Sequence, residues 1–258
     1  MTTVSDLLTL ARDLKRRKAR ERRTLFVAEG VRAVEELVRS PLTVRGLLAT
    51  PAFAATDRGR ALLAGVAERG AHVAEVSESD FLSAADTEQP QGVLALAETP
   101  AHSLDTLARS LGRGVRLLVL DAVQDPGNAG TLVRTAAALG ASGVVALSGT
   151  ADLWNAKVVR SAAGAHFRLP TIQCSANDLL AFVRDQQIAL WGTAADGTPL
   201  ESLRPPARLA LAVGNEGAGL TADVRDAAER MIALPMAQGV ESLNVAVAAG
   251  IALYTLRP

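Results

Sequence analysis

Short apolar runs alternate with amphipathic segments over the N-terminal part of this chain. Runs rich in Val, Leu and Ala predict strands, and apolar residues spaced three or four apart predict helices. This alternation predicts a small three-layer α/β domain. The expected elements are a helix over 4–23, strands over 24–28, 44–49, 72–76 and 92–97, and further helices over 31–39, 58–69 and 79–85.

A stronger alternation follows in the second half of the chain. Its strands are apolar at successive positions, which is typical of a parallel sheet covered on both faces. Asn128 and Asn177 are the expected N-caps of two helices. Ligands of such sheets bind beyond the carboxyl ends of the strands, so we expect the site at this edge. The expected strands cover 115–120, 143–147, 168–172, 188–192, 209–213 and 231–234, and the expected helices cover 128–139, 153–163, 177–187, 222–230 and 243–256.

Helix-breaking residues separate the two alternations. Pro100, Gly112 and Gly114 flank a short apolar helix over 104–111. A short segment between such breakers is typical of a linker. The expected division is an N-terminal domain over 1–98, a linker over 99–114, and a C-terminal α/β domain over 115–258.

Composition excludes several classes of protein. Hydrophobic residues make up 49% of the chain and the formal net charge is zero, so a core can form while the global charge indicates no particular partner. The single cysteine, Cys174, excludes an internal disulfide and is typical of a reducing compartment. His72, His102 and His166 lack metal-ligand spacing, so no metal site is expected. Neither an apolar signal core nor a bilayer-spanning run is present, which predicts a cytoplasmic protein without a membrane segment.

A dense basic run lies at the end of the first expected helix. Its charges are nearly all of one sign, so these residues are not expected to pair among themselves as on an ordinary surface helix. A solvated helix face is the alternative, but a patch that binds RNA phosphates is favoured. The residues expected in this patch are Lys15, Arg16, Arg17, Arg20, Arg22 and Arg23.

Three polar stretches interrupt the apolar pattern of the C-terminal part. Residues 125–128 (Asp-Pro-Gly-Asn) form a strong turn sequence that opens a helix. Residues 214–219 (Gly-Asn-Glu-Gly-Ala-Gly) follow a strand, and their glycines allow a ligand to approach the backbone closely. Within 234–245, Ser242 or Asn244 is placed to cap an apolar helix. The structural alternatives are an ordinary turn, a flexible loop and a capped core helix.

In this order and spacing, the three stretches resemble the motifs of the SpoU/TrmH family of RNA ribose 2′-O-methyltransferases, within the SPOUT superfamily. The resemblance covers residues 115–258. It implies a parallel sheet with a deep trefoil knot, a homodimer, and S-adenosylmethionine (SAM) held by the knot loops. Residues 26–30 and 89–95 are similar to the ends of a small RNA-binding domain found in family members, which itself resembles a class of ribosomal proteins.

The resemblance also implies a substrate and roles for individual residues. The substrate would be structured RNA, with ribosomal RNA favoured over transfer RNA. A catalytically silent RNA-binding protein is the alternative outside enzymes. Arg134 would act on the ribose 2′-hydroxyl as base or as positioning group, and Glu216 would orient Arg134 or the substrate. The implied catalytic residues are Asn128, Arg134, Glu216, Ser242 and Asn244. The implied cofactor-binding residues are Val213, Gly214, Gly217, Ile232, Leu234, Met236, Ser242 and Leu243.

Overall fold

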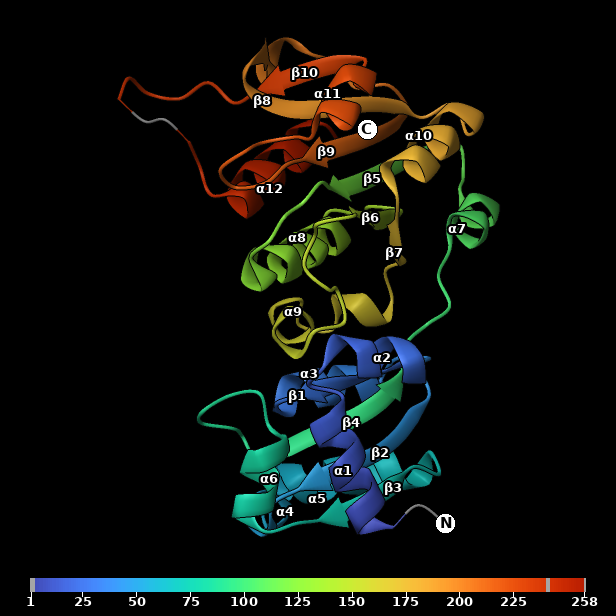
Figure 1. The fold of residues 1–258 in the computed structure, drawn as a ribbon, viewed down its shortest axis with the longest axis vertical. Helices are drawn as coiled ribbons and strands as arrows, with labels where there is room; N and C mark the ends of the chain where they lie inside the picture. Colours follow the sequence, from blue (N-terminus) through green and yellow to red (C-terminus); the bar gives the residue numbers. More distant parts are fainter. Residues whose placement is uncertain (1–2, 240–241, 258) are drawn as a thin grey trace. The chain divides into compact units, whose positions relative to one another are not determined.

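The chain folds into two compact units, which we call unit 1 and unit 2 (Figure 1). The structure, a computed structural model, describes residues 3–239 and 242–257. Unit 1 comprises Met1–Ala101 and Trp154–Arg168, and unit 2 comprises His102–Leu153 and Leu169–Pro258. In the sequence, the second segment of unit 1 therefore lies between the two segments of unit 2.

Unit 2 is built on a six-stranded sheet in the order β10-β8-β9-β5-β6-β7. Every neighbouring pair is parallel, as the continuous apolar strands predict. All the strands therefore end at one edge of the sheet. The strands are β5 Val115–Leu120, β6 Gly143–Leu147, β7 Thr171–Cys174, β8 Ala189–Pro199, β9 Arg208–Val213 and β10 Arg230–Ala233.

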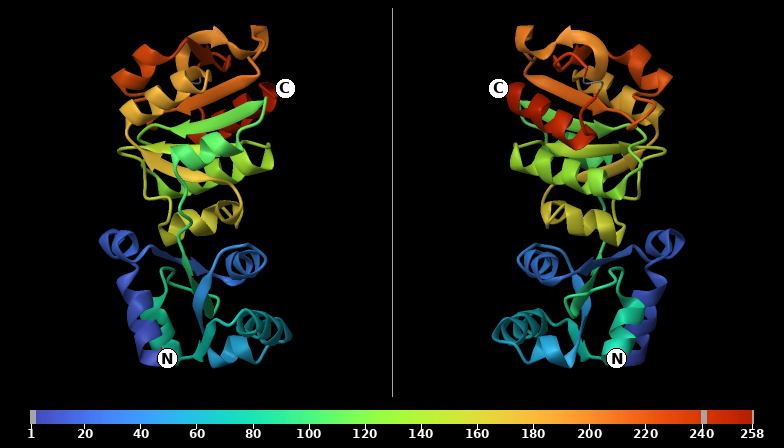
Figure 2. Two further views of the ribbon diagram at one scale, coloured as in Figure 1. Left: turned by 90° about the vertical axis from the view of Figure 1, so that its right-hand side faces the viewer. Right: turned by 90° about the vertical axis from the view of Figure 1, so that its left-hand side faces the viewer.

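Helices cover both faces of this sheet (Figure 2). Helices α7, α10 and α11 pack on one face through Leu107, Leu179 and Val224, which share a hydrophobic core with the strands. On the other face, α12 packs against α8 and β9. The helices are α7 Leu104–Ser110, α8 Pro126–Ala138, α10 Ala176–Asp185, α11 Ala222–Ala227 and α12 Val245–Thr255, with a 3-10 turn at Leu200–Ser202.

Two of the expected helix caps are wrong. Asp125, not Asn128, is the N-cap of α8, and its carboxylate accepts the backbone N–H of Asn128 at 2.7 Å. Pro126 then occupies the first helical position, which it suits because its φ is fixed and no N–H is needed there. Similarly, Ser175 rather than Asn177 caps α10. The cap of α12 is Asn244, one of the two residues expected.

The helix expected within the linker belongs to the core of unit 2. Leu107 of α7 is buried, with Leu104 and Leu111 packed beside it against the sheet. These leucines follow helical spacing, so α7 has one apolar face to bury. The 104–111 segment thus contributes to the packing of unit 2.

Unit 1 has a four-stranded mixed sheet in the order β1-β4-β2-β3. Helices α1 and α6 pack on one face through Leu7 and Phe81. Helices α3 and α5 pack on the other through Leu37 and Val66, giving the expected three layers. The elements are α1 Val4–Asp13, α2 Arg17–Arg23, β1 Leu25–Glu29, α3 Val31–Val38, β2 Val44–Ala49, α4 Pro51–Ala54, α5 Asp57–Glu68, β3 His72–Glu75, α6 Glu78–Ala84 and β4 Val93–Glu98.

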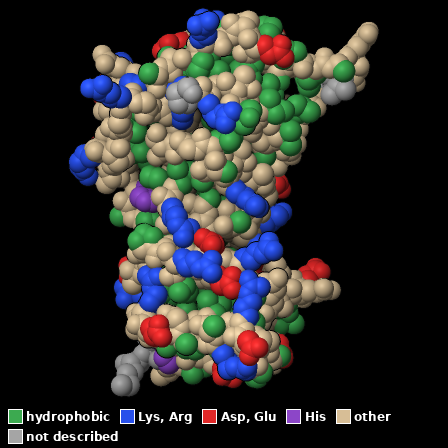
Figure 3. Space-filling view, turned by 180° about the vertical axis from the view of Figure 1, so that it is seen from behind, with side chains coloured by type: hydrophobic (Ala, Val, Ile, Leu, Met, Phe, Trp, Pro, Cys, Tyr) green, Lys and Arg blue, Asp and Glu red, His purple; other side chains and the backbone are tan. Residues whose placement is uncertain are grey.

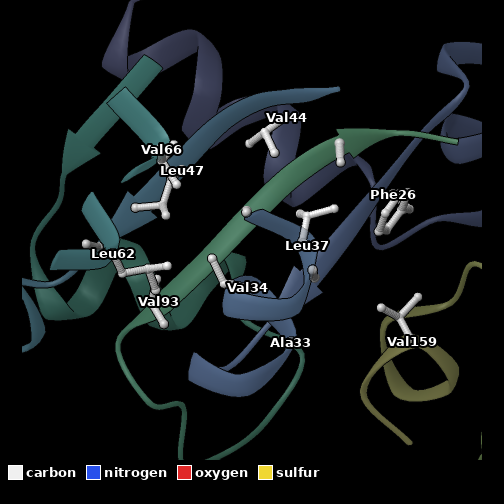
Figure 4. Packing of buried hydrophobic residues seen from close by; sticks show 14 of the residues in the cluster. Phe26, Ala33, Val34, Leu37, Val44, Leu47, Leu62, Val66, Val93 and Val159 are labelled. Carbon is white, nitrogen blue, oxygen red and sulfur yellow. The ribbon is translucent and has the colours of Figure 1, made fainter. Parts of the chain in front are cut away.

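The segment 154–168, containing α9 Ala156–Ser161 and a 3-10 turn at Ala165–Phe167, completes the core of unit 1. Figure 4 shows Val159 of α9 beside Phe26 of β1. The rings of Trp154 and Phe167 lie 4.6 and 5.7 Å from that of Phe26. This aromatic packing explains why the segment leaves unit 2, whose expected range of 115–258 ran without interruption.

Candidate active site

A pocket of about 420 Å³ lies where β8, β9 and β10 end and α12 begins. This is the carboxyl edge of the parallel sheet, where ligands of such sheets bind. It gathers residues from two of the three polar stretches identified in the sequence. The lining residues are Thr193, Ala194, Ala195, Gly214, Asn215, Glu216, Gly219, Ile232, Ala233, Leu234, Met236, Ser242, Leu243, Asn244, Val245, Ala248 and Ala252.

The glycine loop after β9 is closed on itself. Asn215 and Gly219 exchange backbone hydrogen bonds of 2.9 and 3.0 Å. The Asn215 side-chain oxygen also accepts the N–H groups of Gly217 and Ala218, both at 2.9 Å. A Cβ on Gly214 would lie 2.2 Å from the carbonyl carbon of Gly219. Only glycine fits position 214 in this tight loop, so the flexible-loop alternative does not apply.

Two polar contacts fasten the glycine loop to the segment that follows β5. Asn215 Nδ2 donates to the carbonyl of Ala122 at 3.0 Å. The buried carboxylate of Asp121 accepts from the backbone N–H and the hydroxyl of Thr221, at 2.7 and 2.9 Å. Because these bonds lie on both sides of the loop, the loop position is fixed relative to the start of α8.

A chain of side-chain hydrogen bonds joins the three polar stretches, and we call it the Glu216–Asn128–Asn244 relay. Asn128 Nδ2 donates to Glu216 Oε1 at 2.9 Å, and Asn244 Nδ2 donates to Asn128 Oδ1 at 2.9 Å. Asn244 Oδ1 accepts the backbone N–H groups of Ala246 and Val247 at the start of α12. The carboxylate can only accept and those N–H groups can only donate, so both amide orientations are fixed.

Glu216 is held in its ionised form. Partial burial raises its pKa, but hydrogen bonds from the Asn128 side chain and from backbone N–H groups, including those of Gln124 and Asp125, outweigh this effect. The net pKa lies below the usual value for glutamate. A carboxylate with a lowered pKa is a poor proton acceptor at neutral pH, so the geometry favours an orienting role.

Arg134 lies apart from the relay. It is exposed on α8 and does not line the pocket. Its guanidinium has no hydrogen bond or ion pair with any residue in 3–239 or 242–257. The five N–H donors of this group are therefore available to an anionic ligand such as a phosphate.

Most of the expected cofactor residues line the pocket, and two do not. Val213 is buried at the end of β9, and Gly217 bonds to Asn215 within the loop. The sequence reasoning missed residues 193–195. They lie on β8, where pairing with β10 jumps from Gly192 to Thr198, so the intervening residues bulge toward the pocket. They directly follow the expected strand 188–192, whose pairing with β9 ends at Gly192, and this position was the signal that could have found them.

The basic run of α2 is divided between exposed and buried side chains. Arg16, Arg17, Arg22 and Arg23 are exposed. Arg20 is buried, and its Nη1 donates to the carbonyls of Leu14 and Lys15 at 2.7 and 2.8 Å. Arg20 was expected to bind phosphate, and this placement contradicts that expectation, because the buried guanidinium stabilises the turn between α1 and α2.

Metal and membrane features were also searched for across the described ranges 3–239 and 242–257. No group of three or more His, Cys, Asp or Glu side chains there is arranged to hold a metal ion. No helix in those ranges is both long and apolar enough to cross a bilayer.

The fold and the site define a class of α/β enzymes that have a ligand pocket at the edge of a parallel sheet and a separate, smaller domain. The chain belongs to the SpoU rRNA methylase family, whose model matches residues 116–254. Residues 9–95 match the MRM3-like substrate binding domain. Both matches agree with the family resemblance identified from the sequence motifs.

Relatives and solved structures extend this likeness over nearly the whole chain. The 23S rRNA (guanosine(2553)-2′-O)-methyltransferase RlmP of Bacillus subtilis is 36% identical, over 95% of this chain and 93% of its own. The 23S rRNA (guanosine-2′-O-)-methyltransferase RlmB of a Burkholderia species is 34% identical, over 89% and 95%. The SpoU methyltransferase AviRb of Streptomyces viridochromogenes, solved with AdoMet, aligns with a TM-score of 0.85 and 27% identity, covering 97% of this chain and 96% of its own.

Proposed function

We propose that this protein transfers a methyl group from SAM to the 2′-hydroxyl of a guanosine ribose in 23S ribosomal RNA. The observation that carries the proposal is the Glu216–Asn128–Asn244 relay, which joins the three motifs at the edge of one pocket. RlmP and RlmB are 23S rRNA guanosine 2′-O-methyltransferases, which supports a guanosine of ribosomal RNA over one of transfer RNA. A catalytically silent RNA-binding protein would not need polar side chains hydrogen-bonded in this way at the edge of a cofactor pocket.

The pocket fits SAM in size and in chemistry. Its volume lies within the usual range for small-molecule sites. Ile232, Leu234, Leu243 and Ala248 supply apolar walls for a flat ring. Among the described residues, the backbone groups of 234–236 make no hydrogen bonds with one another or with other backbone groups, so they are available to bond polar atoms of a ligand. Bound there, SAM supplies a methyl group on a sulfonium sulfur.

The chain's own residues act by orientation. The relay holds Glu216 at the pocket edge and fixes the start of α12. Ser242 and Leu243 lie just before this helix and are positioned with it. Arg134 offers its guanidinium to the RNA phosphate next to the reacting ribose. Arginine does not lose its proton in proteins, so alignment of the hydroxyl with the methyl group is the contribution that these residues make.

Mapping methylated riboses in ribosomal RNA, with and without the gene, tests the proposal. One guanosine in 23S rRNA should lose its 2′-O-methyl group in the deletion strain and regain it on complementation. Purified protein should transfer labelled methyl from SAM to the unmodified 23S transcript. Loss of a methyl group from transfer RNA instead, or no loss from any RNA, would contradict it.

Asn128→Asp should make turnover dependent on pH. The new carboxylate would face Glu216 where the amide now donates at 2.9 Å. Two neighbouring carboxylates raise the pKa of the pair, because both cannot ionise cheaply. Turnover should fall at least roughly tenfold at neutral pH and recover in part as the pH is lowered and one carboxylate is protonated.

Adding Glu216→Gln to Asn128→Asp provides the matched control. In the double variant the new amide at position 216 can donate to the new carboxylate at position 128. The contact therefore has one donor and one acceptor again, and it carries a single negative charge. The double variant should therefore regain turnover at neutral pH. Rate–pH profiles of the two variants that cannot be distinguished from each other would count against an orienting relay.

We also propose a homodimer formed through α12. Leu243, Val247, Ile251 and Tyr254 are each between 41% and 56% exposed. On α12, Val247, Ile251 and Tyr254 are spaced by three or four positions, so they share one face of the helix, and Leu243 lies just before its N-cap. A neighbouring side of α12 packs against α8, with Gly250 close to Thr135. An exposed apolar stripe of this kind is typical of an interface.

Combined Val247→Asp and Ile251→Asp should convert the dimer to a monomer, because two desolvated carboxylates per protomer are costly in an apolar interface. Light scattering coupled to size exclusion measures the mass. Val4→Asp, which changes a similarly exposed apolar residue on α1, should leave the mass at that of a dimer. A monomeric wild-type protein at micromolar concentration would contradict the proposal.

Two further features are part of this proposal. A ribosomal RNA substrate and a single free cysteine, Cys174, support a cytoplasmic location. The trefoil knot implied by the family resemblance stays a prediction. It would bring residues 193–195 of β8 and the segment before α12 to one pocket, which both segments line.

A further inference from the structure

Three exposed arginines converge on one carboxylate in unit 1. Asp13 stands at the end of α1, and Arg16, Arg22 and Arg23 all form ion pairs with it. The Arg22 and Arg23 contacts are 3.4 and 3.2 Å long, both to Oδ2, whereas Arg16 bonds Oδ1. We call these four residues the Asp13 cluster.

The remaining cations of the same run have other tasks. Arg12 and Lys15 connect α1 to α6, by bonds to Asp80 and to the carbonyl of Ser83. Arg17 pairs with Glu21 one turn further along α2. Arg20 is buried beneath them. Apart from Lys18, which is exposed, the run is therefore a scaffold of paired and buried side chains that presents the Asp13 cluster.

The cluster keeps an excess of positive charge and of hydrogen-bond donors. Three guanidinium groups face a single carboxylate, and each has five N–H donors of which Asp13 uses few. The side chains of Arg16, Arg22 and Arg23 are 76%, 70% and 45% exposed, whereas that of Asp13 is 13% exposed. The carboxylate thus lies beneath the guanidiniums. Hydrogen bonds from Arg16 and Arg23 lower its pKa, which keeps it charged.

Charges elsewhere on unit 1 are arranged differently. Around α3 and α5, Arg58 pairs with Glu35, and Glu36 is shared by Arg39 and Arg168. Figure 3 shows basic and acidic side chains lying next to one another on the face seen from behind. One or two arginines on a carboxylate leave less net positive charge than the three on Asp13, so the Asp13 cluster is better suited to an anion.

We propose that Arg16, Arg22 and Arg23, held together by Asp13, form one preorganised site for a phosphate of the RNA backbone. The ligand is a phosphodiester because its planar pairs of oxygens match the guanidinium fork, and its charge balances the excess of the cluster. The inference rests on the proposed function for its RNA substrate and deepens it by naming the residues of unit 1 that hold that substrate.

Filter binding of the full-length protein to an in vitro transcript of 23S rRNA, at low and moderate salt, tests the proposal. Arg16→Ala and Arg23→Ala should each weaken binding roughly tenfold at low salt and flatten its salt dependence. Their combination should weaken binding little more than the stronger single change, because the two residues serve one site. Losses that add fully would identify independent surface charges and overturn the proposal.

Asp13→Asn separates a preorganised site from diffuse charge. The variant gains net positive charge, so a diffuse basic surface would bind RNA more tightly. A site ordered by the carboxylate should instead bind at least roughly threefold more weakly, since the guanidiniums must be ordered on binding. Binding that is unchanged or tighter in Asp13→Asn would overturn the proposal.

Arg60→Ala is the matched control, because Arg60 is an exposed arginine of unit 1 that forms an ion pair with Asp57 and donates to the carbonyl of Ala55. Its affinity should stay within about twofold of wild type. Thermal melting checks that each variant is folded, and calorimetry checks that each still binds SAM. If the wild-type protein binds the transcript but transfers no methyl group, the proposed function fails while this comparison still stands.

Discussion

Arg134→Ala should lower methyl transfer at least roughly a hundredfold, the usual scale for removing a positioned catalytic group. Arg134 is exposed on α8, does not line the cofactor pocket and has no partner within the described part of the chain. Its removal therefore breaks no contact of the fold, and alanine is well tolerated within a helix. The expected signature is lost turnover with unchanged thermal stability and unchanged SAM affinity, measured by a methyl-transfer assay, melting and calorimetry.

Two variants sharpen this test. Arg134→Lys keeps the charge but loses the bidentate fork of the guanidinium. Partial activity in this variant would indicate that the charge of Arg134 matters, whereas almost no activity would indicate that its bidentate geometry matters. Arg184→Ala removes another exposed arginine of unit 2, paired only with its neighbour Asp185, and should leave turnover near that of wild type. Near-native transfer by Arg134→Ala would mean that the motif assignment of this residue is wrong.

Leu243→Arg should have the opposite signature and abolish SAM binding first. Leu243 lines the apolar part of the pocket, and its side chain is 41% exposed. A long cationic side chain there would occupy the space of the ligand and repel its sulfonium charge. Because the leucine is only partly buried, the cost to folding should be small. Calorimetry should detect no binding at SAM concentrations that saturate the wild type.

Leu82→Arg is the control for this second prediction. Leu82 is a leucine of comparable exposure on α6 of unit 1 and does not line the pocket. SAM affinity should not change in this variant. Wild-type SAM affinity in a folded Leu243→Arg protein would contradict the assignment of this pocket to the cofactor.

The sequence by itself determined the sheet of unit 2 and the position of its site. Strand 209–213 is apolar at every position and strand 115–120 at every position except Arg116, which is typical of a parallel sheet buried on both faces. Parallel strands share a common carboxyl edge. The glycine loop at 214–219 directly follows such a strand, so its placement at the pocket could be predicted locally.

The tertiary structure decided which polar side chains meet. Glu216 and Asn128 are 88 positions apart, and Asn128 and Asn244 are 116 apart. Spacing along the chain places each residue on a loop or a helix terminus, but it does not determine the bonds between them. Those bonds form because three loops at one sheet edge bring donors and acceptors within reach of one another.

Burial also depended on packing that the sequence pattern does not contain. Arg20 belongs to the same basic run as Arg16, yet it is buried because the break between α1 and α2 leaves carbonyls that its guanidinium satisfies. The segment 154–168 has the composition of a unit 2 helix, yet Trp154 and Phe167 pack against Phe26. Periodicity defines which face of an element is apolar, and only the assembled fold defines which neighbour covers it.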